Sequence, residues 1–314
     1  MIHTPWGLLP VADAHVHFFS HGFFAALAAQ KGVAPPQLAA LLSRQSPPWQ
    51  IPEEDPRQLA DVWAHELDRH GVAKASLLAS VPGDAESVIA AVARHPERFY
   101  GYAMVNPAAP GEPTQLVARI AAALASGHIQ ALCFFPAMHR YSIQDERVAA
   151  LLELLAERRP HAVAFVHCGV LSVGVRKALG LPSPFDMKFS NPIDLHAVAL
   201  RFPQLRFIVP HFGAGYLREA LMLCDLCPNV YLDTSSSNSW MRYEEAHLDL
   251  RAVFRRALDV AGPQRLLFGT DSSFFPRGWD AAIFETQSKA LYEIGVNEEL
   301  ARLIFHANLV RLFS

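Results

Sequence analysis

The sequence is poor in cysteine, in long apolar runs and in excess charge, and each shortage excludes a class of protein. Four cysteines among 314 residues are too few for a disulfide scaffold. No uninterrupted apolar run reaches the roughly 18 residues of a transmembrane helix, and residues 1–6 lack the basic segment of a signal peptide. The formal net charge of −3 argues against a nucleic acid or an anionic membrane as partner. We therefore expect a cytoplasmic protein whose ligand is a small molecule.

Short apolar segments alternate with helical patterns along the chain, which is about half hydrophobic. The expected strands span residues 11–17, 74–81, 99–105, 128–135, 162–167, 205–210, 229–233 and 265–270. The expected helices span residues 57–71, 85–95, 114–126 (with Thr114 as N-cap), 144–159, 192–202, 215–226, 248–261, 279–294 and 297–313. Strict alternation indicates a parallel sheet covered by helices, and eight units can close a (β/α)8 TIM barrel. A doubly wound open sheet is the alternative, but the glycine-rich turn that it would need after the first strand is missing.

One segment departs from this alternation, and we interpret it as an insertion into a single α/β domain that spans residues 1–314. Residues 18–55 are too long for an ordinary strand-to-helix loop. They contain two short helical patterns, at residues 23–30 and 37–44, and then a proline-rich stretch around Trp49. We expect this insertion to cover the mouth of the barrel. Its Trp49 and phenylalanines either line a pocket there or pack the insertion against the barrel.

The first expected strand ends in a pair of histidines, His15 and His17. Side chains two residues apart on a strand point to the same face, so the two imidazoles project together. Two imidazoles at this spacing can hold one divalent metal ion. The alternative is a pair of core histidines whose N–H groups are bonded to the backbone.

Further residues with the chemistry of metal ligands follow other strands. His167 follows the fifth strand, His211 the sixth and Asp271 the eighth. In a barrel the carboxyl ends of the strands share one rim, where the active site is built. Imidazole and carboxylate are good zinc ligands, and bound zinc lowers the pKa of a water molecule to about 7. A further histidine or aspartate must then take or give a proton.

Four motifs in order resemble those of the amidohydrolase superfamily: Asp13-Ala14-His15-Val16-His17, Val166-His167-Cys168-Gly169, Pro210-His211-Phe212-Gly213 and Phe268-Gly269-Thr270-Asp271. The resemblance is closest to the amidohydrolase-related branch, which includes aminocarboxymuconate-semialdehyde decarboxylase, aromatic-acid decarboxylases and lactonases. Residues 191–211 and the tail at residues 304–313 also resemble that branch.

This resemblance implies that His15, His17, His167 and Asp271 hold one divalent ion, with Zn²⁺ expected and Mn²⁺ as the alternative. It implies that His211 polarises or deprotonates the water, or steadies the oxygen of the substrate, and that Asp271 can shuttle a proton. It also allows a homodimer. Members with two metals have a bridging lysine on the fourth strand, whereas Cys133 lies near that place here. We therefore expect one ion, with Cys133 as either a ligand or a small buried thiol.

Several loop residues could contact a substrate at the same rim. A cationic side chain there either anchors a substrate carboxylate or is a solvated loop charge; the candidates are Arg140, Arg176, Lys188, Arg242 and Arg277. The segment from Ser235 to Asn238 could bond the substrate or satisfy loop backbone. His21 and His139 are two further candidates near the rim.

The resemblance and the rim residues together predict a metal-dependent hydrolase, in which metal-activated water attacks the amide, ester or lactone carbonyl of a small molecule that can carry a carboxylate. The alternative is a nonoxidative decarboxylase of an aromatic or unsaturated acid, with the same ligands. A third hypothesis is an inactive barrel kept for binding. Three imidazoles converging with a carboxylate argue against that hypothesis, because an inactive site has no physical need of them.

Overall fold

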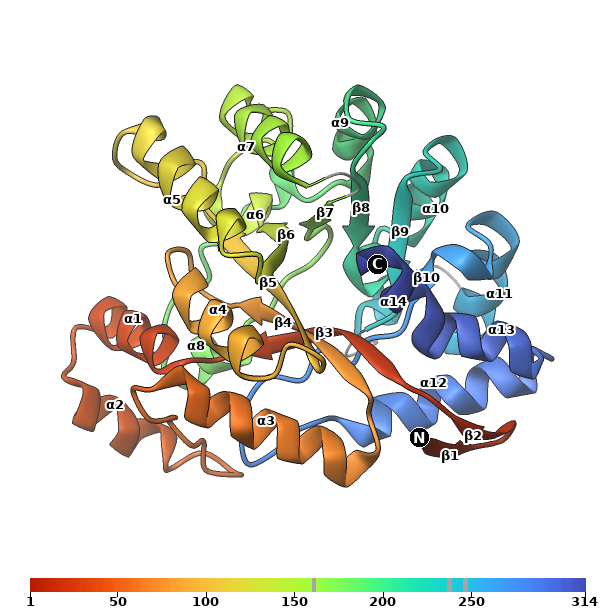
Figure 1. Cartoon of the computed structure of the whole chain (residues 1–314), viewed down its shortest axis with the longest axis horizontal. Coiled ribbons are helices and arrows are strands. Elements are labelled where there is room, and N and C mark those ends of the chain that lie inside the picture. The colour runs from red at the N-terminus through yellow and green to blue at the C-terminus, as the bar shows by residue number, and fades with distance from the viewer. Residues whose placement is uncertain (160–161, 236–238, 245–247) are drawn as a thin grey trace.

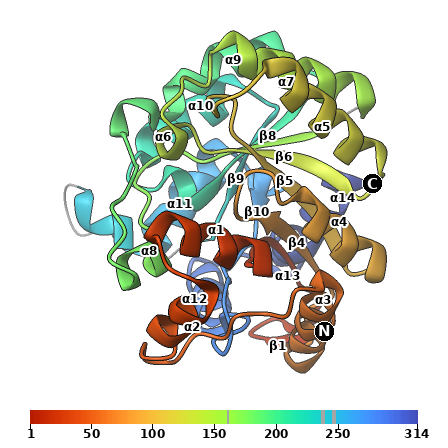
Figure 2. The same cartoon turned by 90° about the vertical axis from the view of Figure 1, so that its left-hand side faces the viewer.

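Eight parallel strands form the centre of the structure, a computed structural model that describes residues 1–159, 162–235, 239–244 and 248–314. Each strand pairs with its neighbours in sequence order, from β3 to β10. Val16 bridges to Ser272, and the Ala14 N–H donates to the Phe268 carbonyl at 2.8 Å, so the first and last strands meet. The sheet therefore closes into the expected TIM barrel (Figures 1 and 2). The strands are β3 (Ala12–Phe18), β4 (Lys74–Ala79), β5 (Phe99–Val105), β6 (Ile129–Phe134), β7 (Val163–Val166), β8 (Arg206–Val209), β9 (Val230–Asp233) and β10 (Leu266–Leu267).

Helices surround the strands, as Figures 1 and 2 show. They are α3 (Pro56–His70), α4 (Ala85–Arg94), α5 (Pro113–Ala125), α6 (Pro136–His139), α7 (Glu146–Arg158), α8 (Gly174–Ala178), α9 (His196–Arg201), α10 (Leu217–Leu226), α11 (Leu250–Val260), α12 (Ala281–Glu293), α13 (Glu298–Arg302) and α14 (Asn308–Phe313). Thr114 was expected to cap α5, but Glu112 occupies that position and the helix begins at Pro113. The fixed φ of proline suits the first helical position, so the helix begins one residue earlier.

The core has two layers, as a barrel requires. Side chains on the outward face of the strands pack against the helices, for example Leu77 and Val209. Side chains on the inward face fill the barrel, for example Leu78, Tyr102 and Phe165. This inner layer lies beneath the rim and supports the residues at the strand ends. None of the described helices has the length and apolar character needed to cross a membrane.

The insertion after β3 has a small core of its own. Its helices are α1 (His21–Lys31) and α2 (Pro35–Leu42), and Ser20 caps α1 by accepting a hydrogen bond from the Phe23 N–H. Phe24 and Leu38 are buried in this cluster together with Val175 of α8. Trp49 stacks on Phe274 with 3.8 Å between ring centroids. The insertion is thus packed against the loops after β7 and β10, at the mouth of the barrel.

An antiparallel hairpin precedes the barrel, and sequence reasoning did not predict it. Its strands are β1 (Ile2–Thr4) and β2 (Gly7–Leu9). Trp6 lies between them and donates from Nε1 to the Val296 carbonyl at 2.7 Å. Its ring contacts those of Tyr292 and Phe305, so the hairpin is anchored to the helices at the end of the chain.

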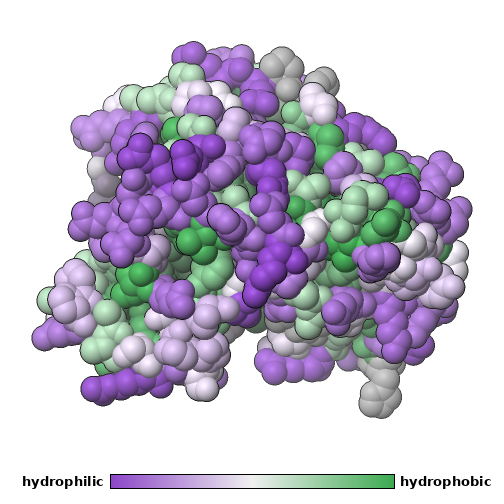
Figure 3. Space-filling view, turned by 60° about the horizontal axis from the view of Figure 1, so that its bottom comes forward, coloured by the Kyte–Doolittle hydropathy of each residue, from purple (hydrophilic) through white to green (hydrophobic). Residues whose placement is uncertain are grey.

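The surface seen in Figure 3 is largely hydrophilic, and its apolar residues form separate patches between polar ones. Some large apolar side chains are exposed singly, such as Met222 on α10 and Leu200 on α9. Single exposed apolar residues are ordinary on protein surfaces and by themselves indicate no function.

Candidate active site

The two histidines at the end of β3 are held in defined orientations. The Nδ1 atom of His15 lies 2.6 Å from Oδ2 of Asp233, at the end of β9. The Nδ1 atom of His17 lies 2.9 Å from the hydroxyl oxygen of Ser80, which itself donates to the Leu78 carbonyl. Both Nδ1 atoms therefore act as donors, and both Nε2 atoms keep a free lone pair. The two Nε2 atoms lie 3.4 Å apart.

His211 and Asp271 both have left-handed backbones, with φ of 57° and 62°. This conformation is costly for residues other than glycine and is concentrated at functional sites. The Nδ1 atom of His211 donates to the Ser235 carbonyl at 2.7 Å, so its Nε2 atom is also free. The Asp271 N–H donates to the His15 carbonyl at 3.0 Å. Asp271 is thereby fixed directly beside the first strand.

These side chains converge on one point. Oδ1 of Asp271 lies 3.3 Å from Nε2 of His17 and 3.6 Å from Nε2 of His15. Ligand atoms about 2.0–2.1 Å from a tetrahedral zinc ion are about 3.3 Å from one another, so these separations suit shared ligands. His15, His211 and Asp271 also offer ligand atoms that all lie within 4.8 Å of one another. His211 therefore lies close enough to serve as a further ligand, besides the role implied by the resemblance.

His167 supplies the clearest sign that a group belongs in this site. Its side chain is buried, and its Nε2 atom has no hydrogen-bond partner in the described protein. Its ring stacks on Phe135 and lies 5.4 Å from the ring of His211. A buried polar atom without a partner costs about 1–3 kcal/mol, and a metal ion would satisfy it. The donor set therefore fits a divalent ion, and His15, His17, His167 and Asp271 are the residues that would hold it.

The electrostatics of the site favour the metal-binding forms of His17, His167, His211 and Asp271, whereas His15 is shifted toward its protonated form. Burial lowers the pKa of His17, His167 and His211, so these imidazoles are neutral near pH 7. Burial also opposes protonation of His15, but the Asp233 carboxylate outweighs it and raises the pKa of His15. Burial opposes ionisation of Asp271, but the neighbouring imidazoles of His17, His15 and His211 together lower its pKa. Neutral imidazoles and an ionised carboxylate are the states that bind a metal.

A buried carboxylate, Asp13, joins the two ends of the barrel beneath the site. Its Oδ1 atom accepts hydrogen bonds from the N–H groups of His15, at 2.9 Å, and Thr270, at 3.1 Å. Its Oδ2 atom accepts from the Thr270 hydroxyl and from Nε1 of Trp279, at 2.8 Å. Burial raises the pKa of Asp13 to about 6, and the hydrogen bonds oppose that rise. Asp13 thus positions His15 and the segment that carries Asp271.

A cavity of about 230 Å³, here called the inner pocket, opens beside these residues. His17, His167, His211 and Asp271 lie in its wall, and most of its remaining lining is apolar. The apolar lining comes from the insertion and from loops at the strand ends; it consists of Phe19, Phe23, Trp49, Met104, Phe135, Met138, Leu171, Val173, Val175 and Phe274. The phenylalanines and Trp49 of the insertion therefore do both things that were considered for them: they pack the insertion down and they line the pocket.

Of the five loop cations, Arg277 is the one that lines the inner pocket. Its Nη2 atom donates to the Asp271 carbonyl at 3.1 Å and to the Ser273 hydroxyl at 3.0 Å. Its guanidinium lies 4.9 Å from the centre of the Phe274 ring. Arg242 lines a smaller cavity of about 100 Å³, which shares His167, His211 and Asp271 with the inner pocket.

The other rim candidates lie elsewhere. Arg140 donates to the Pro184 carbonyl, Arg176 donates to the Pro182 carbonyl, and the ammonium of Lys188 lies over the ring of Phe189. His21 bonds the Pro52 carbonyl, and His139 stacks on Tyr141. Cys133 is buried inside the barrel, where burial raises the pKa of its thiol well above the ordinary value. Ser235 supports His211, while Ser236, Ser237 and Asn238 lie outside the described residues.

Sequence reasoning missed three supporting residues, Asp13, Ser80 and Asp233. Asp13 and Asp233 carried a weak signal, because each is an aspartate beside apolar residues of an expected strand, where an ionised side chain needs partners. Ser80 follows β4 without any distinguishing pattern. Metal-bound histidines commonly donate their second N–H to such groups, so these residues belong to the site.

We expect the Asp233→Ala variant to bind zinc about 10–100-fold more weakly than the wild type, because His15 loses the acceptor that fixes its orientation. A competition titration against a chromogenic chelator measures this change. Asp225→Ala, on the exposed surface of α10, is the matched control and should leave the affinity unaltered. Equal affinities in both variants would show that Asp233 does not support a metal ligand.

A (β/α)8 barrel with imidazoles and a carboxylate at its strand ends has the architecture of a metal-dependent barrel enzyme. The sequence matches the amidohydrolase family model over residues 12–314, so the chain belongs to that family. This confirms the resemblance seen in the motifs.

The individual proteins that resemble this chain match it either over a short segment or at low sequence identity. The protein fluG of Emericella nidulans is 32% identical over 87 residues, which cover 28% of this chain and a tenth of that protein. A probable 2-pyrone-4,6-dicarboxylic acid hydrolase from Acinetobacter baumannii, with citric acid bound, is 14% identical with a TM-score of 0.59, and the match covers 97% of this chain and 99% of the other. A zinc-bound amidohydrolase from Burkholderia multivorans is 15% identical with a TM-score of 0.60 and the same coverage. At such identities the two structures establish the fold only.

Proposed function

We propose that this protein is a metal-dependent hydrolase that cleaves the amide, ester or lactone carbonyl of a small carboxylate-bearing molecule. One observation carries the proposal: the Nε2 lone pairs of the rim histidines and the Asp271 carboxylate converge in a pocket that contains a single arginine among the described residues. Membership of the amidohydrolase family supports the reaction class. The hydrolase name of the similar Acinetobacter structure supports a carboxylate substrate.

We assign each site residue a separate role from its position in the pocket. A divalent ion held by His15, His17, His167 and Asp271 would polarise a carbonyl and lower the pKa of water to about 7. His211 donates from Nδ1 to the Ser235 carbonyl, and its low pKa leaves Nε2 unprotonated near neutral pH. We assign His211 Nε2 as the atom that accepts a proton from the attacking water, or that steadies the substrate oxygen once protonated. Asp271 is the second candidate for carrying the proton to the leaving group.

Arg277 gives the pocket its charge selectivity. An arginine presents a planar fork that matches a carboxylate, and its position above Phe274 limits the orientations that the guanidinium can adopt. Because Arg277 bonds the Asp271 carbonyl, a carboxylate bound to it lies next to the reacting groups. The apolar lining excludes water around the rest of a substrate and strengthens this attraction.

The same contact of Arg277 favours one alternative, nonoxidative decarboxylation of an aromatic or unsaturated acid. A carboxylate held this close to Asp271 and His211 could itself be the group that leaves. Hydrolysis and decarboxylation share the ligands but differ in product, so one pair of assays separates them.

The proposal is tested with zinc-loaded protein and a panel of lactones, esters and amides that carry a carboxylate, starting with 2-pyrone-4,6-dicarboxylic acid. Acid release is followed in a pH-stat, and carbon dioxide release is followed in parallel with aromatic and unsaturated acids. We expect acid release without carbon dioxide, and its loss after chelation. Carbon dioxide release alone would establish the alternative, and inactivity on the whole panel would contradict a hydrolase of this substrate class.

For any substrate found in this way, we expect Arg277→Ala to raise KM about 10–100-fold with a smaller change in kcat, because a charge-assisted hydrogen bond to the substrate is worth about 1.5–3 kcal/mol. Arg277→Lys should restore part of the loss. Arg140→Ala, which removes a loop arginine directed at the Pro184 carbonyl, is the matched control. An unchanged KM in Arg277→Ala would exclude Arg277 as the substrate anchor.

A further inference from the structure

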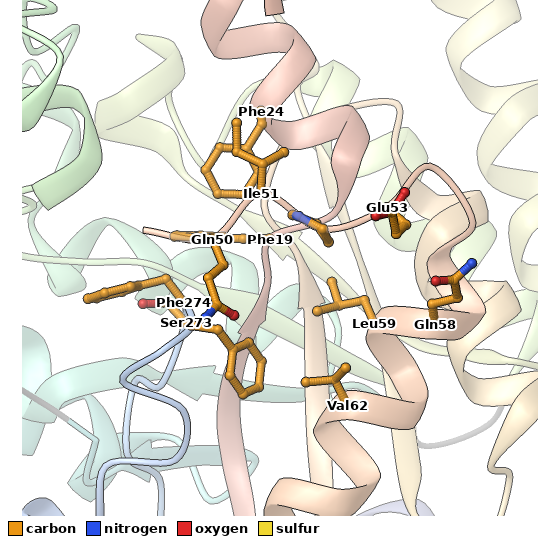
Figure 4. A pocket seen from close by; sticks show the side chains of 12 residues that line it. Phe19, Phe24, Gln50, Ile51, Glu53, Gln58, Leu59, Val62, Ser273 and Phe274 are labelled. Atoms are coloured by element: carbon orange, nitrogen blue, oxygen red, sulfur yellow. The ribbon is translucent and has the colours of Figure 1, made fainter. Parts of the chain in front are cut away.

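A second cavity, here called the outer pocket, lies beside the inner pocket and has a volume of about 180 Å³. Three parts of the chain enclose it: the insertion, the first half of α3, and the loop after β10. Figure 4 shows Leu59 and Val62 of α3 facing the same space as Ile51 and Phe24 of the insertion. Glu53 and Gln58 lie together on the side away from Phe274. The outer pocket therefore has facing apolar side chains, with Glu53 and Gln58 on one side and Gln50 and Ser273 near Phe274 on the other.

The outer pocket adjoins the inner pocket, and the two cavities share part of their walls. Phe19, Ser273 and Phe274 line both cavities. Trp49 stacks on Phe274 with an angle of 2° between the rings, and the Gln50 N–H donates to the Phe275 carbonyl at 2.9 Å. These contacts join the insertion to the loop after β10 and place the Phe274 ring in the walls of both cavities.

The size and chemistry of the outer pocket define what it can hold. An engineered apolar cavity of about 150 Å³ takes up benzene, so a cavity of this volume suits one ring or a short alkyl chain. The apolar lining residues Phe24, Ile51, Leu59 and Phe275 offer no charge. Glu53 at the edge disfavours a second anionic group at that end.

We propose that the outer pocket binds an apolar arm of the substrate, a short alkyl chain or one ring, while the reacting group and its carboxylate lie in the inner pocket. The proposal rests on the proposed function, because it takes the carboxylate to be anchored at Arg277. Ser273 lines both cavities and bonds Arg277, so the proposed arm would extend along Ser273 from one cavity to the other. The preferred substrate is therefore an amphipathic monocarboxylate with its apolar part distal to the reacting carbonyl.

The test is calorimetric titration of the zinc-loaded full chain with acetate, butanoate, hexanoate and octanoate. Each methylene group that enters an apolar pocket should strengthen binding about threefold to fourfold. We therefore expect octanoate to bind at least about tenfold more tightly than butanoate. The same affinity for all four acids, or no measurable binding of any of them, would overturn the proposal.

The variant Val62→Trp tests whether the alkyl chain of the acid binds in the outer pocket or on another part of the surface. Val62 is 46% exposed, so a larger side chain there can fill the pocket without disturbing the core. We expect the octanoate-to-butanoate affinity ratio to fall to within about threefold in this variant. Met222→Trp adds the same ring to α10, where Met222 is 50% exposed, and should keep the wild-type ratio. A wild-type ratio in Val62→Trp would place the chain outside the outer pocket and overturn the proposal.

Arg277→Ala separates failure of this proposal from failure of the proposed function. Loss of the anchor should weaken binding of all four acids together, about tenfold, and leave the ratio intact. If octanoate binds at least about tenfold more tightly than butanoate but Arg277→Ala leaves the affinities unchanged, the outer pocket binds the alkyl chain and Arg277 is not the carboxylate anchor. If Arg277→Ala weakens binding but the ratio is flat, the anchor stands and the outer pocket does not bind an arm.

Discussion

Replacing His15 by alanine is expected to lower the zinc affinity of the protein by more than about 100-fold. The substitution removes one Nε2 ligand atom from the group formed with His17 and Asp271. It also leaves the buried Asp233 carboxylate without the partner that lies 2.6 Å away. Competition with a chelator of known affinity measures the change.

Two further variants make this result specific. His167→Ala should cause a comparable loss, because the buried Nε2 atom of His167 has no other partner in the described structure. His65→Ala, on the exposed face of α3, removes a histidine that bonds only the Asp61 carbonyl of its own helix, and should leave zinc binding unchanged. Zinc affinities equal to that of the wild type in both His15→Ala and His167→Ala would exclude the rim as the metal site.

Replacing Asp13 by alanine is expected to lower the free energy of unfolding by about 3–5 kcal/mol. Four donors would lose their acceptor: the N–H groups of His15 and Thr270, the Thr270 hydroxyl and Nε1 of Trp279. Three of these donors belong to Thr270 and Trp279, which follow β10. The lost hydrogen bonds therefore weaken the contact between the last strand and β3, where the barrel closes. For a chain of this size the melting temperature should fall on the order of 10 °C, as followed by circular dichroism.

The control for Asp13 is an exposed aspartate that pairs with one arginine. Asp68 pairs with Arg98 at 2.7 Å and its side chain is 65% exposed. An exposed ion pair contributes about 0.2–1 kcal/mol, so Asp68→Ala should shift the melting temperature by a few degrees at most. If the two variants melt together, Asp13 does not hold the barrel closed.

The sequence predicted the barrel because its strands are buried on both faces and therefore appear as short apolar runs between helical patterns. The bounds of β5 match the expected strand at residues 99–105, because Asn106-Pro107 ends it sharply. The last strand was expected at residues 265–270, but β10 covers only Leu266–Leu267. After β10 the backbone leaves the strand conformation, forms hydrogen bonds with β3 and brings Asp271 to the rim. This change of backbone conformation depends on partners more than 250 residues away in sequence, so it could not be predicted from the local pattern. The hairpin at the N-terminus was missed because its strands are only three residues long.

The candidate site was predictable to the extent that its chemistry lies at strand ends. His15, His17, His167, His211 and Asp271 could be chosen because parallel strands deliver their carboxyl ends to one rim. The residues that orient these histidines could not be predicted in the same way. Asp233, for example, bonds His15 but lies 218 residues away in sequence. Nor could sequence separate Arg277 from the other loop cations, because only the folded loops decide which guanidinium faces the cavity.

The most direct test of a single metal site at this rim is the metal content of the purified, zinc-loaded protein, measured by plasma mass spectrometry beside His15→Ala and Asp271→Ala. The expected result is about one zinc ion per chain in the wild type and much less than one in both variants. Two ions per chain would contradict the single-ion prediction made from the missing lysine on β6. No zinc in the wild type would contradict the metal site itself, and the histidines would then have to act directly as acids and bases.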